Sequence, residues 1–123
     1  MTHAPFAEAW PRIPARALRH FSPEVMAEAF NADAENRGAC LLCEDGVLAV
    51  KTESDDNGGT RLFVLVAAGA PGAFGRTEAD VIDLARRFNC TAVAFKTHRA
   101  RAWRKVLGPE WAQTDDEFSR SLR

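Results

Sequence analysis

The chain has 123 residues, 46% of them hydrophobic, so a single domain spanning residues 1–123 can bury a core without disulfides or metal ions. Its 16 basic and 17 acidic residues leave a net charge of -1, which excludes a global field that steers the protein to nucleic acid or to an anionic membrane. The longest uninterrupted apolar run, residues 62–68, is too short to cross a bilayer, and the N-terminus lacks the apolar segment of an export signal. We therefore expect a protein that is not secreted, with neither a membrane nor nucleic acid as its partner.

The N-terminal part of the sequence predicts two helices. Prolines interrupt the first dozen residues and leave room for a short helix over residues 14–21. Ser22 is a favourable N-cap residue, and Pro23 suits the first helical position that follows it. Apolar residues then recur at helical spacing, so we expect the second helix to continue to about Gly38, a residue typical of helix C-termini.

The middle of the chain predicts an antiparallel meander of three strands. Residues 39–44 and 47–52 favour β-structure and are joined at Asp45-Gly46, a strong hairpin signal. After a polar loop, residues 61–68 are apolar at nearly every position. Such a run is typical of a central strand that is covered on both faces.

A helix and a parallel strand are predicted next. Thr77 and Asp80 have the spacing of a capping box, and apolar residues from Val81 onward line one helical face. Residues 91–96 favour a strand. Two strands joined through a helix require a right-handed crossover, so this strand is predicted to lie parallel to residues 61–68.

The C-terminal part predicts a basic helix over residues 99–107 and a last strand over residues 117–122. Helical spacing places Ala100, Trp103, Val106 and Leu107 inward, and Arg101, Arg104 and Lys105 outward. The predicted fold class is therefore α/β, of the α+β type with a mixed sheet. It consists of an antiparallel meander plus one parallel strand pair, with flanking helices.

One part of the sequence carries a family resemblance. Within residues 83–107, the run L-A-R-R-F-N-C-T-A-V-A-F followed by R-A-R-A-W-R-K-V-L resembles the helix, strand and arginine-tryptophan helix of small GNAT-like (N-acyltransferase) proteins encoded by tailed phages and prophages. The order of elements is similar, and V-K-T-E and F-S-R-S-L lie where that group places similar residues. The resemblance spans most of the chain. It implies a GNAT-like acyl-CoA N-acyltransferase fold, located in the bacterial host cytoplasm or in the virion.

The resemblance also implies a site. In active members of the superfamily, the central strand and the following parallel strand splay apart, acetyl-CoA enters between them, and its pyrophosphate lies on a loop at a helix N-terminus. The corresponding residues are Val66, Ala67 and Ala68 on the strand and Gly72, Gly75 and Arg76 on the loop. Acetyl-CoA or CoA is thus the implied cofactor. Glu53, at the end of the second strand, is the candidate general base.

Two features depart from the enzymatic pattern. The loop over residues 69–76 does not fit the family's order of Arg or Gln followed by spaced glycines, and the chain has no tyrosine to protonate the leaving thiolate. These departures favour a phage- or prophage-encoded, non-catalytic module that serves as a virion or accessory component, with phage structural proteins or a second copy of itself as partners. The alternative is an N-acetyltransferase that moves an acetyl group from acetyl-CoA to an amine. An exposed interface patch would favour the module, and an open cleft between the parallel strands would favour the enzyme.

The cysteines and a basic segment are the remaining candidates. Cys40 and Cys43 form a C-x-x-C motif, but positions three apart on a strand face opposite sides, so no metal site is predicted. With Cys90 they are predicted to be core thiols in a reducing compartment. The basic residues within 96–105 offer charge to CoA phosphates, nucleic acid or an acidic protein, although the balanced total charge argues against nucleic acid.

Overall fold

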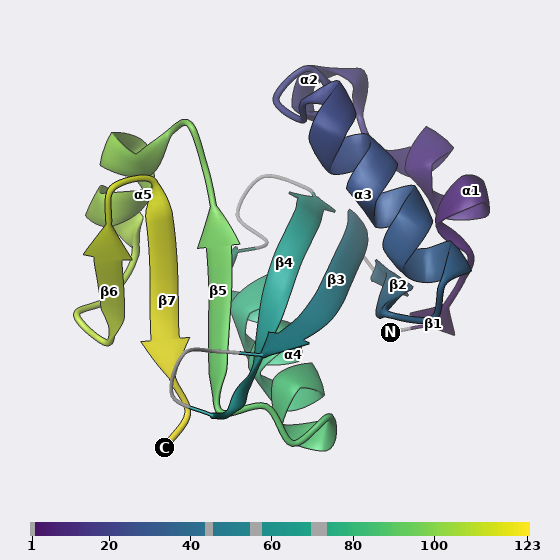
Figure 1. The fold of residues 1–123 in the computed structure, drawn as a ribbon. Coiled ribbons are helices and arrows are strands. Elements are labelled where there is room, and N and C mark those ends of the chain that lie inside the picture. Colours follow the sequence, from purple (N-terminus) through teal and green to yellow (C-terminus); the bar gives the residue numbers. More distant parts are fainter. Residues whose placement is uncertain (1, 44–45, 55–57, 70–73) are drawn as a thin grey trace.

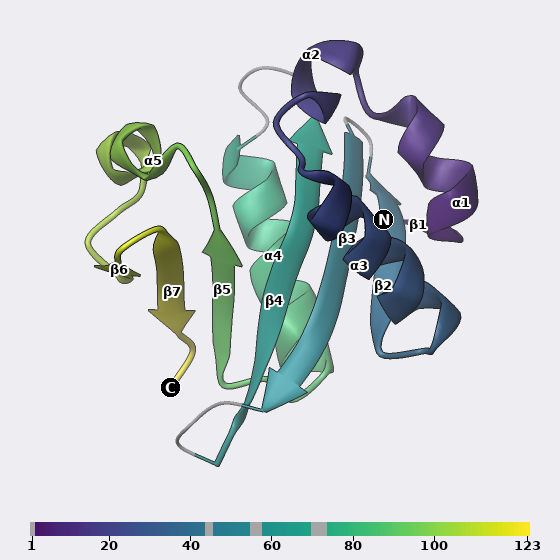
Figure 2. The ribbon, with the colours of Figure 1, turned by 45° about the horizontal axis from the view of Figure 1, so that its top comes forward.

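The computed structural model describes residues 2–43, 46–54, 58–69 and 74–123, with positions 43, 69 and 74–76 described by their backbone. Seven strands form one mixed sheet in the order β1-β2-β3-β4-β5-β7-β6, with helices on both faces (Figures 1 and 2). Every neighbouring pair is antiparallel except β4 and β5, which are parallel. The predicted mixed sheet with one parallel strand pair is confirmed.

Four short elements precede the first long helix: β1 (Thr2–His3), α1 (Phe6–Ala9), the 3-10 helix η1 (Trp10–Arg12) and α2 (Ala15–Leu18). Phe6 anchors this segment, because its side chain is fully buried and its ring packs edge-on against Phe30 with the centroids 4.7 Å apart. The Phe6 N–H also donates to Asp33 Oδ2 at 3.1 Å. Of these four elements, the sequence analysis predicts only α2, which is shorter than the helix predicted over residues 14–21.

Helix α3 (Pro23–Ala34) begins as predicted. The Ser22 Oγ accepts the backbone N–H three residues on, at 3.1 Å, which satisfies one of the free donors of the first turn. The helix ends earlier than expected, because Asn36 adopts a left-handed backbone with a φ of 55°. Gly38 is therefore not a helix terminus but the first residue of β2, where a side chain would collide with the Val50 carbonyl oxygen.

The predicted meander consists of β2 (Gly38–Cys43), β3 (Gly46–Ser54) and β4 (Thr60–Gly69). The predicted hairpin turn at residues 44–45 lies outside the described residues. The pairing of β4 with β3 passes from Val64 to Val66 and leaves Leu65 as a bulge. A bulge bends the strand that carries it, and this one lies midway along the central strand.

Helix α4 (Phe74–Arg87) connects β4 to β5 (Ala92–Lys96), and the two strands are parallel as predicted. The predicted capping box at Thr77 is wrong. A capping box requires a non-helical backbone at its first residue, whereas Thr77 already lies inside the helix. Gly75 and Arg76, predicted to belong to a loop, form part of the first helical turn.

Helix α5 (Ala100–Val106) is followed by a hairpin of β6 (Trp111–Thr114), which the sequence does not predict, and β7 (Glu117–Ser121). Two side chains of α5 are oriented opposite to the prediction. Val106 is 61% exposed, and Arg104 is half-buried, donating at 2.8 Å to the carbonyls of both Gly108 and Trp111. Arg104 turns inward because its guanidinium binds carbonyl groups in the segment after α5 and at the start of β6.

The sheet separates two apolar clusters. On the face covered by α4 and α5, here the α4 face, Leu62, Val93 and Phe118 are fully buried. On the face covered by the N-terminal helices, here the α3 face, Phe6 and Val66 are fully buried. Strand β4 contributes to both clusters, as predicted for a central strand that is covered on both faces.

Candidate functional site

Strands β4 and β5 separate toward their C-terminal ends. Their parallel pairing begins at Arg61 opposite Ala92 and ends at Val64 opposite Phe95. One residue later β5 ends, whereas β4 continues past the Leu65 bulge, and the two ribbons diverge in both views (Figures 1 and 2). In α/β sheets, ligands bind at the C-terminal ends of strands where the sheet opens. This opening is therefore the first candidate site.

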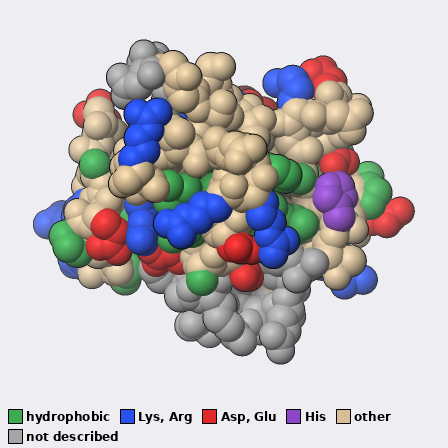
Figure 3. Space-filling model, turned by 90° about the horizontal axis from the view of Figure 1, so that it is seen from below, with side chains coloured by type: hydrophobic (Ala, Val, Ile, Leu, Met, Phe, Trp, Pro, Cys, Tyr) green, Lys and Arg blue, Asp and Glu red, His purple; other side chains and the backbone are tan. Residues whose placement is uncertain are grey.

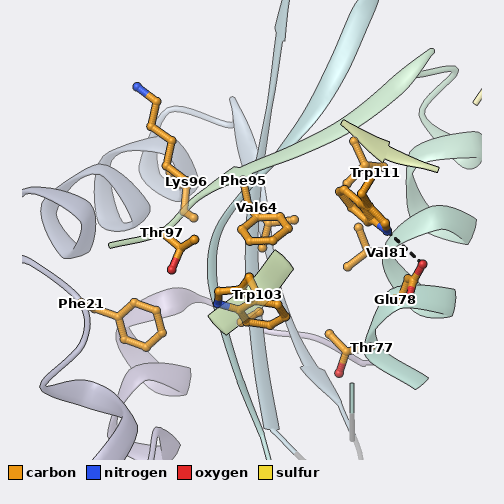
Figure 4. A pocket seen from close by; sticks show the side chains of 13 residues that line it. Phe21, Val64, Thr77, Glu78, Val81, Phe95, Lys96, Thr97, Trp103 and Trp111 are labelled. Atoms are coloured by element: carbon orange, nitrogen blue, oxygen red, sulfur yellow. Dashed lines mark hydrogen bonds between the residues drawn. The ribbon is translucent and has the colours of Figure 1, made fainter. Parts of the chain in front are cut away.

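A cavity of about 140 Å³ occupies the opening. Its aromatic and aliphatic wall includes Phe21, Val64, Phe95, Trp103 and Trp111 (Figure 4). Three polar side chains, those of Thr77, Glu78 and Thr97, stand around the same space, whereas the Lys96 side chain points away from it (Figure 4). An apolar wall with a few polar groups is the usual composition of a small-molecule site.

Glu78 is fixed in this wall by two donors. Its Oε1 accepts the Trp111 indole N–H at 3.1 Å and an Arg120 guanidinium N–H at 2.7 Å. The carboxylate side chain is 20% exposed. Because its carboxylate is already bound by Arg120 and Trp111, Glu78 serves to orient Trp111 in the wall of the cavity.

A second hollow of about 490 Å³ adjoins the cavity and opens toward α2 and the start of α3. The two share Phe21, Leu65, Ala67, Lys96, Thr97 and Trp103 in their walls. They therefore form one continuous space, here called the β4–β5 cleft. Its second half, the α3-side groove, is also lined by His20, His98, Arg99 and Asp116.

His20 is the titratable group whose properties stand out in the groove. Its ring lies 5.7 Å from that of His98, measured between centroids, and the residue is half-exposed. Partial desolvation, followed by the positive charges of Arg19 and Arg99 and by His98, lowers the pKa of His20 below its ordinary value of 6.5. The imidazole is therefore neutral at pH 7 and able to accept a proton.

The predicted cofactor residues have different positions in the structure. Ala67 is exposed in the β4–β5 cleft and lines both of its halves, and Ala68 lines the α3-side groove. Val66 is fully buried in the core and exposes no surface to the cleft. Gly72 lies outside the described residues, and Gly75 and Arg76 lie in the first turn of α4.

The predicted base, Glu53, lies at the opposite end of the sheet. It pairs across the strands with Arg61 at the start of β4, six residues before Ala67, which corresponds to about 20 Å along the strand. Its carboxylate forms ion pairs with Arg61 and, at 3.4 Å, with Lys51. The structure does not bring Glu53 together with the cleft residues, and two cations already bind it.

Charges of both signs mix at this end of the molecule. Arg61 also bonds Glu117 on β7 at 3.2 Å, and Lys51 pairs with Glu28 on α3. The view from below shows Lys and Arg side chains across the middle of the surface with Asp and Glu side chains beside them (Figure 3). A surface of mixed sign is unlike the single-sign field that binds nucleic acid.

The basic residues within 96–105 do not form one surface. Lys96, His98 and Arg99 line the α3-side groove, whereas Arg104 caps the end of α5. The predicted core thiols Cys40 and Cys90 are buried in clusters on opposite faces of the sheet, and burial raises the pKa of the Cys90 thiol. Within the described residues, no three His, Cys, Asp or Glu side chains are grouped as a metal ion would require.

Sequence reasoning missed His20, Glu78 and Trp111 as site residues. They come from three different parts of the chain, the segment after α2, helix α4 and strand β6, and they meet at the cleft only because these parts pack around the open ends of β4 and β5. No local spacing in the sequence encodes that arrangement.

Comparison of the chain with protein-family models, with curated proteins and with solved structures gave no match. Across the described segments, no helix has the length and apolar character needed to span a membrane. Function therefore has to be inferred from the geometry and chemistry of the β4–β5 cleft.

Proposed function

We propose that the chain is a GNAT-like protein that binds an acyl-CoA in the β4–β5 cleft and transfers the acyl group to an amine. The observation that supports it best is the opening between two parallel strands, with a continuous cleft running through it. An open cleft at this place is the feature expected of the enzyme rather than of a non-catalytic module.

The exposed edge of β4 suits the pantetheine arm of an acyl-CoA. Pairing with β5 ends at Val64, so beyond it the strand borders the cleft instead of a neighbouring strand. An extended ligand can hydrogen-bond such an edge as an added strand would. Ala67 leaves room there, because its side chain is a single methyl group in the wall of the cleft.

His20 is the general base in this proposal, in place of Glu53. It lines the same groove as Ala67, and its lowered pKa keeps it neutral at pH 7. The amine nitrogen attacks the thioester carbonyl carbon, a C–N bond forms, the C–S bond breaks, and His20 takes the proton that the nitrogen loses. The proton then passes to the departing thiolate.

The absence of tyrosine from the chain is compatible with this chemistry. A thiol has an ordinary pKa of about 8.5, so the departing thiolate can be protonated by water or by the His20 imidazolium near neutral pH. A dedicated acid side chain would speed the step without being required for it.

The competing hypothesis is the non-catalytic virion or accessory module of a phage or prophage. It draws on the irregular glycine loop and the missing tyrosine. The large exposed apolar side chains among the described residues lie on separate segments, with Trp10 on η1, Phe30 on α3, Phe88 just after α4 and Val106 on α5. They do not by themselves identify a docking surface.

Release of free thiol from acetyl-CoA, followed with a panel of primary amines, tests the proposed function. We expect release that depends on the amine and an acetylated amine of the corresponding mass. Acetyl-CoA without amine is the control, because it measures hydrolysis. If acetyl-CoA binds but no amine is acetylated, the transferase proposal fails and the non-catalytic module stands.

A further inference from the structure

The α3-side groove of the β4–β5 cleft is unevenly charged. Lys96, His98 and Arg99 line it from the end of β5 and the segment that follows, and His20 lines it from the segment after α2. Asp116 is the one carboxylate among the described residues in its wall. The groove therefore offers two permanent positive charges, two imidazoles and one negative charge to whatever enters it.

Lys96 and Arg99 are not neutralised by the carboxylates that the structure describes. At the other end of the sheet, Lys51 and Arg61 both bind carboxylates, and Arg120 binds Glu78. By contrast, no carboxylate among the described residues lies within ion-pair distance of Lys96 or Arg99. Their charge remains available to an anion from outside.

Charge and size together restrict the acceptor. A polyamine or a lysine-rich peptide brings further positive charge and is repelled by Lys96 and Arg99. An amine with a carboxylate or phosphate group finds partners for both ends, because Asp116 lines the same groove as the cations. The groove of about 490 Å³ lies within the size range of small-molecule sites.

We propose that the acceptor is a small primary amine that carries an anionic group, a carboxylate or a phosphate, which Lys96 and Arg99 bind while His20 faces the amine. This inference rests on the proposed function for the identity of the reaction. The presence of an anion site in the groove can be tested without acyl-CoA.

The first experiment compares kcat/KM for four amines at saturating acetyl-CoA: ethanolamine, O-phosphoethanolamine, β-alanine and putrescine. We expect kcat/KM for the preferred anionic amine to exceed that for ethanolamine by about tenfold or more, which is the effect of one charge-assisted contact. Putrescine should have the lowest kcat/KM of the four. The ratio of kcat/KM for O-phosphoethanolamine to that for β-alanine shows whether the site prefers a phosphate or a carboxylate. Equal values for neutral and anionic amines overturn the proposal.

A pair of arginine variants assigns the preference to the groove. Arg99→Gln should raise KM for the anionic amine about tenfold more than it raises KM for ethanolamine, when both are measured at the same pH. Arg101→Gln is the matched control, because Arg101 is an exposed arginine two positions away that does not line the groove. If both variants lose the same preference, the effect is one of net charge and the assigned contact is wrong.

The second experiment follows the imidazole signals by nuclear magnetic resonance as O-phosphoethanolamine or β-alanine is added without acyl-CoA. The chain has 3 histidines, and His3 lies on β1 at the far edge of the sheet, so it serves as an internal reference. If the signals of His20 and His98 shift saturably while the His3 signal does not change, the anion site is supported. This holds even if acetyl-CoA does not bind and the transferase proposal fails. If neither groove histidine shifts, the anion site is refuted, whatever the outcome of acetyl-CoA binding.

Discussion

His20→Asn is expected to lower kcat for acyl transfer by about 10²–10⁴-fold, the contribution typical of a positioned general base. The affinity for acetyl-CoA should change little, because the pantetheine arm is proposed to bind the backbone edge of β4 and not the His20 side chain. Initial rates and calorimetric affinity measure the two effects separately. His3→Asn is the control and should retain full activity, since His3 is remote from the cleft.

The activity of the unaltered protein should fall as the pH drops through the pKa of His20. That pKa lies below 6.5 because of desolvation and of the charges of Arg19, Arg99 and His98, so the base is lost only in acid solution. Arg99→Gln removes one of these charges and should move the acid limb to higher pH. The stability of the fold should change in the same direction. In the unfolded chain His20 has its ordinary pKa of 6.5 and binds a proton more readily than in the folded chain, so the free energy of unfolding decreases as the pH falls below 6.5 toward the folded-state pKa. A full acid limb in His20→Asn would show that another group is the base.

Phe118→Ala is expected to lower the free energy of unfolding by about 3–5 kcal/mol, the range for removing a buried aromatic ring. Phe118 has no exposed surface, and its ring stacks on Phe95 with the centroids 5.4 Å apart. The Arg104 guanidinium lies 5.5 Å from the centre of the same ring. The substitution therefore leaves a cavity next to the wall of the β4–β5 cleft.

Urea unfolding followed by circular dichroism measures this loss. Phe88→Ala is the matched control, because that ring is 46% exposed, and it should cost roughly 1 kcal/mol or less. Similar losses for the two variants would contradict the position of Phe118 at the centre of the core.

The long, strongly patterned elements of the fold could be predicted from the sequence. The apolar run of β4 and the cap at Ser22 each carry a local signal that the structure reproduces. By contrast, β1 has two residues and is defined by its pairing with β2, so no pattern within it can identify a strand. The turn between β6 and β7 contains Asp115 at a φ of 54° in the pair Asp115-Asp116, a weaker hairpin signal than Asn-Gly or Asp-Gly.

The candidate site could be predicted only in part. Ala67 is implied by the family resemblance, which places the ligand at the end of the central strand, and the structure puts it in the cleft. Glu53 also lies at the end of a strand, but β3 runs antiparallel to β4, so its end meets the start of β4 and not the cleft. His20 enters the groove through the packing of the segment after α2 beside the diverging strands, which no spacing in the sequence encodes.

Calorimetric titration of three proteins with acetyl-CoA tests the claim that an acyl-CoA occupies the β4–β5 cleft. Ala67→Trp fills the cleft, whereas Ala112→Trp places the same ring on an exposed position of β6. We predict micromolar binding by the unaltered protein and by Ala112→Trp, and no measurable binding by Ala67→Trp. Binding that survives Ala67→Trp, or no binding by the unaltered protein at millimolar acetyl-CoA, would contradict the claim.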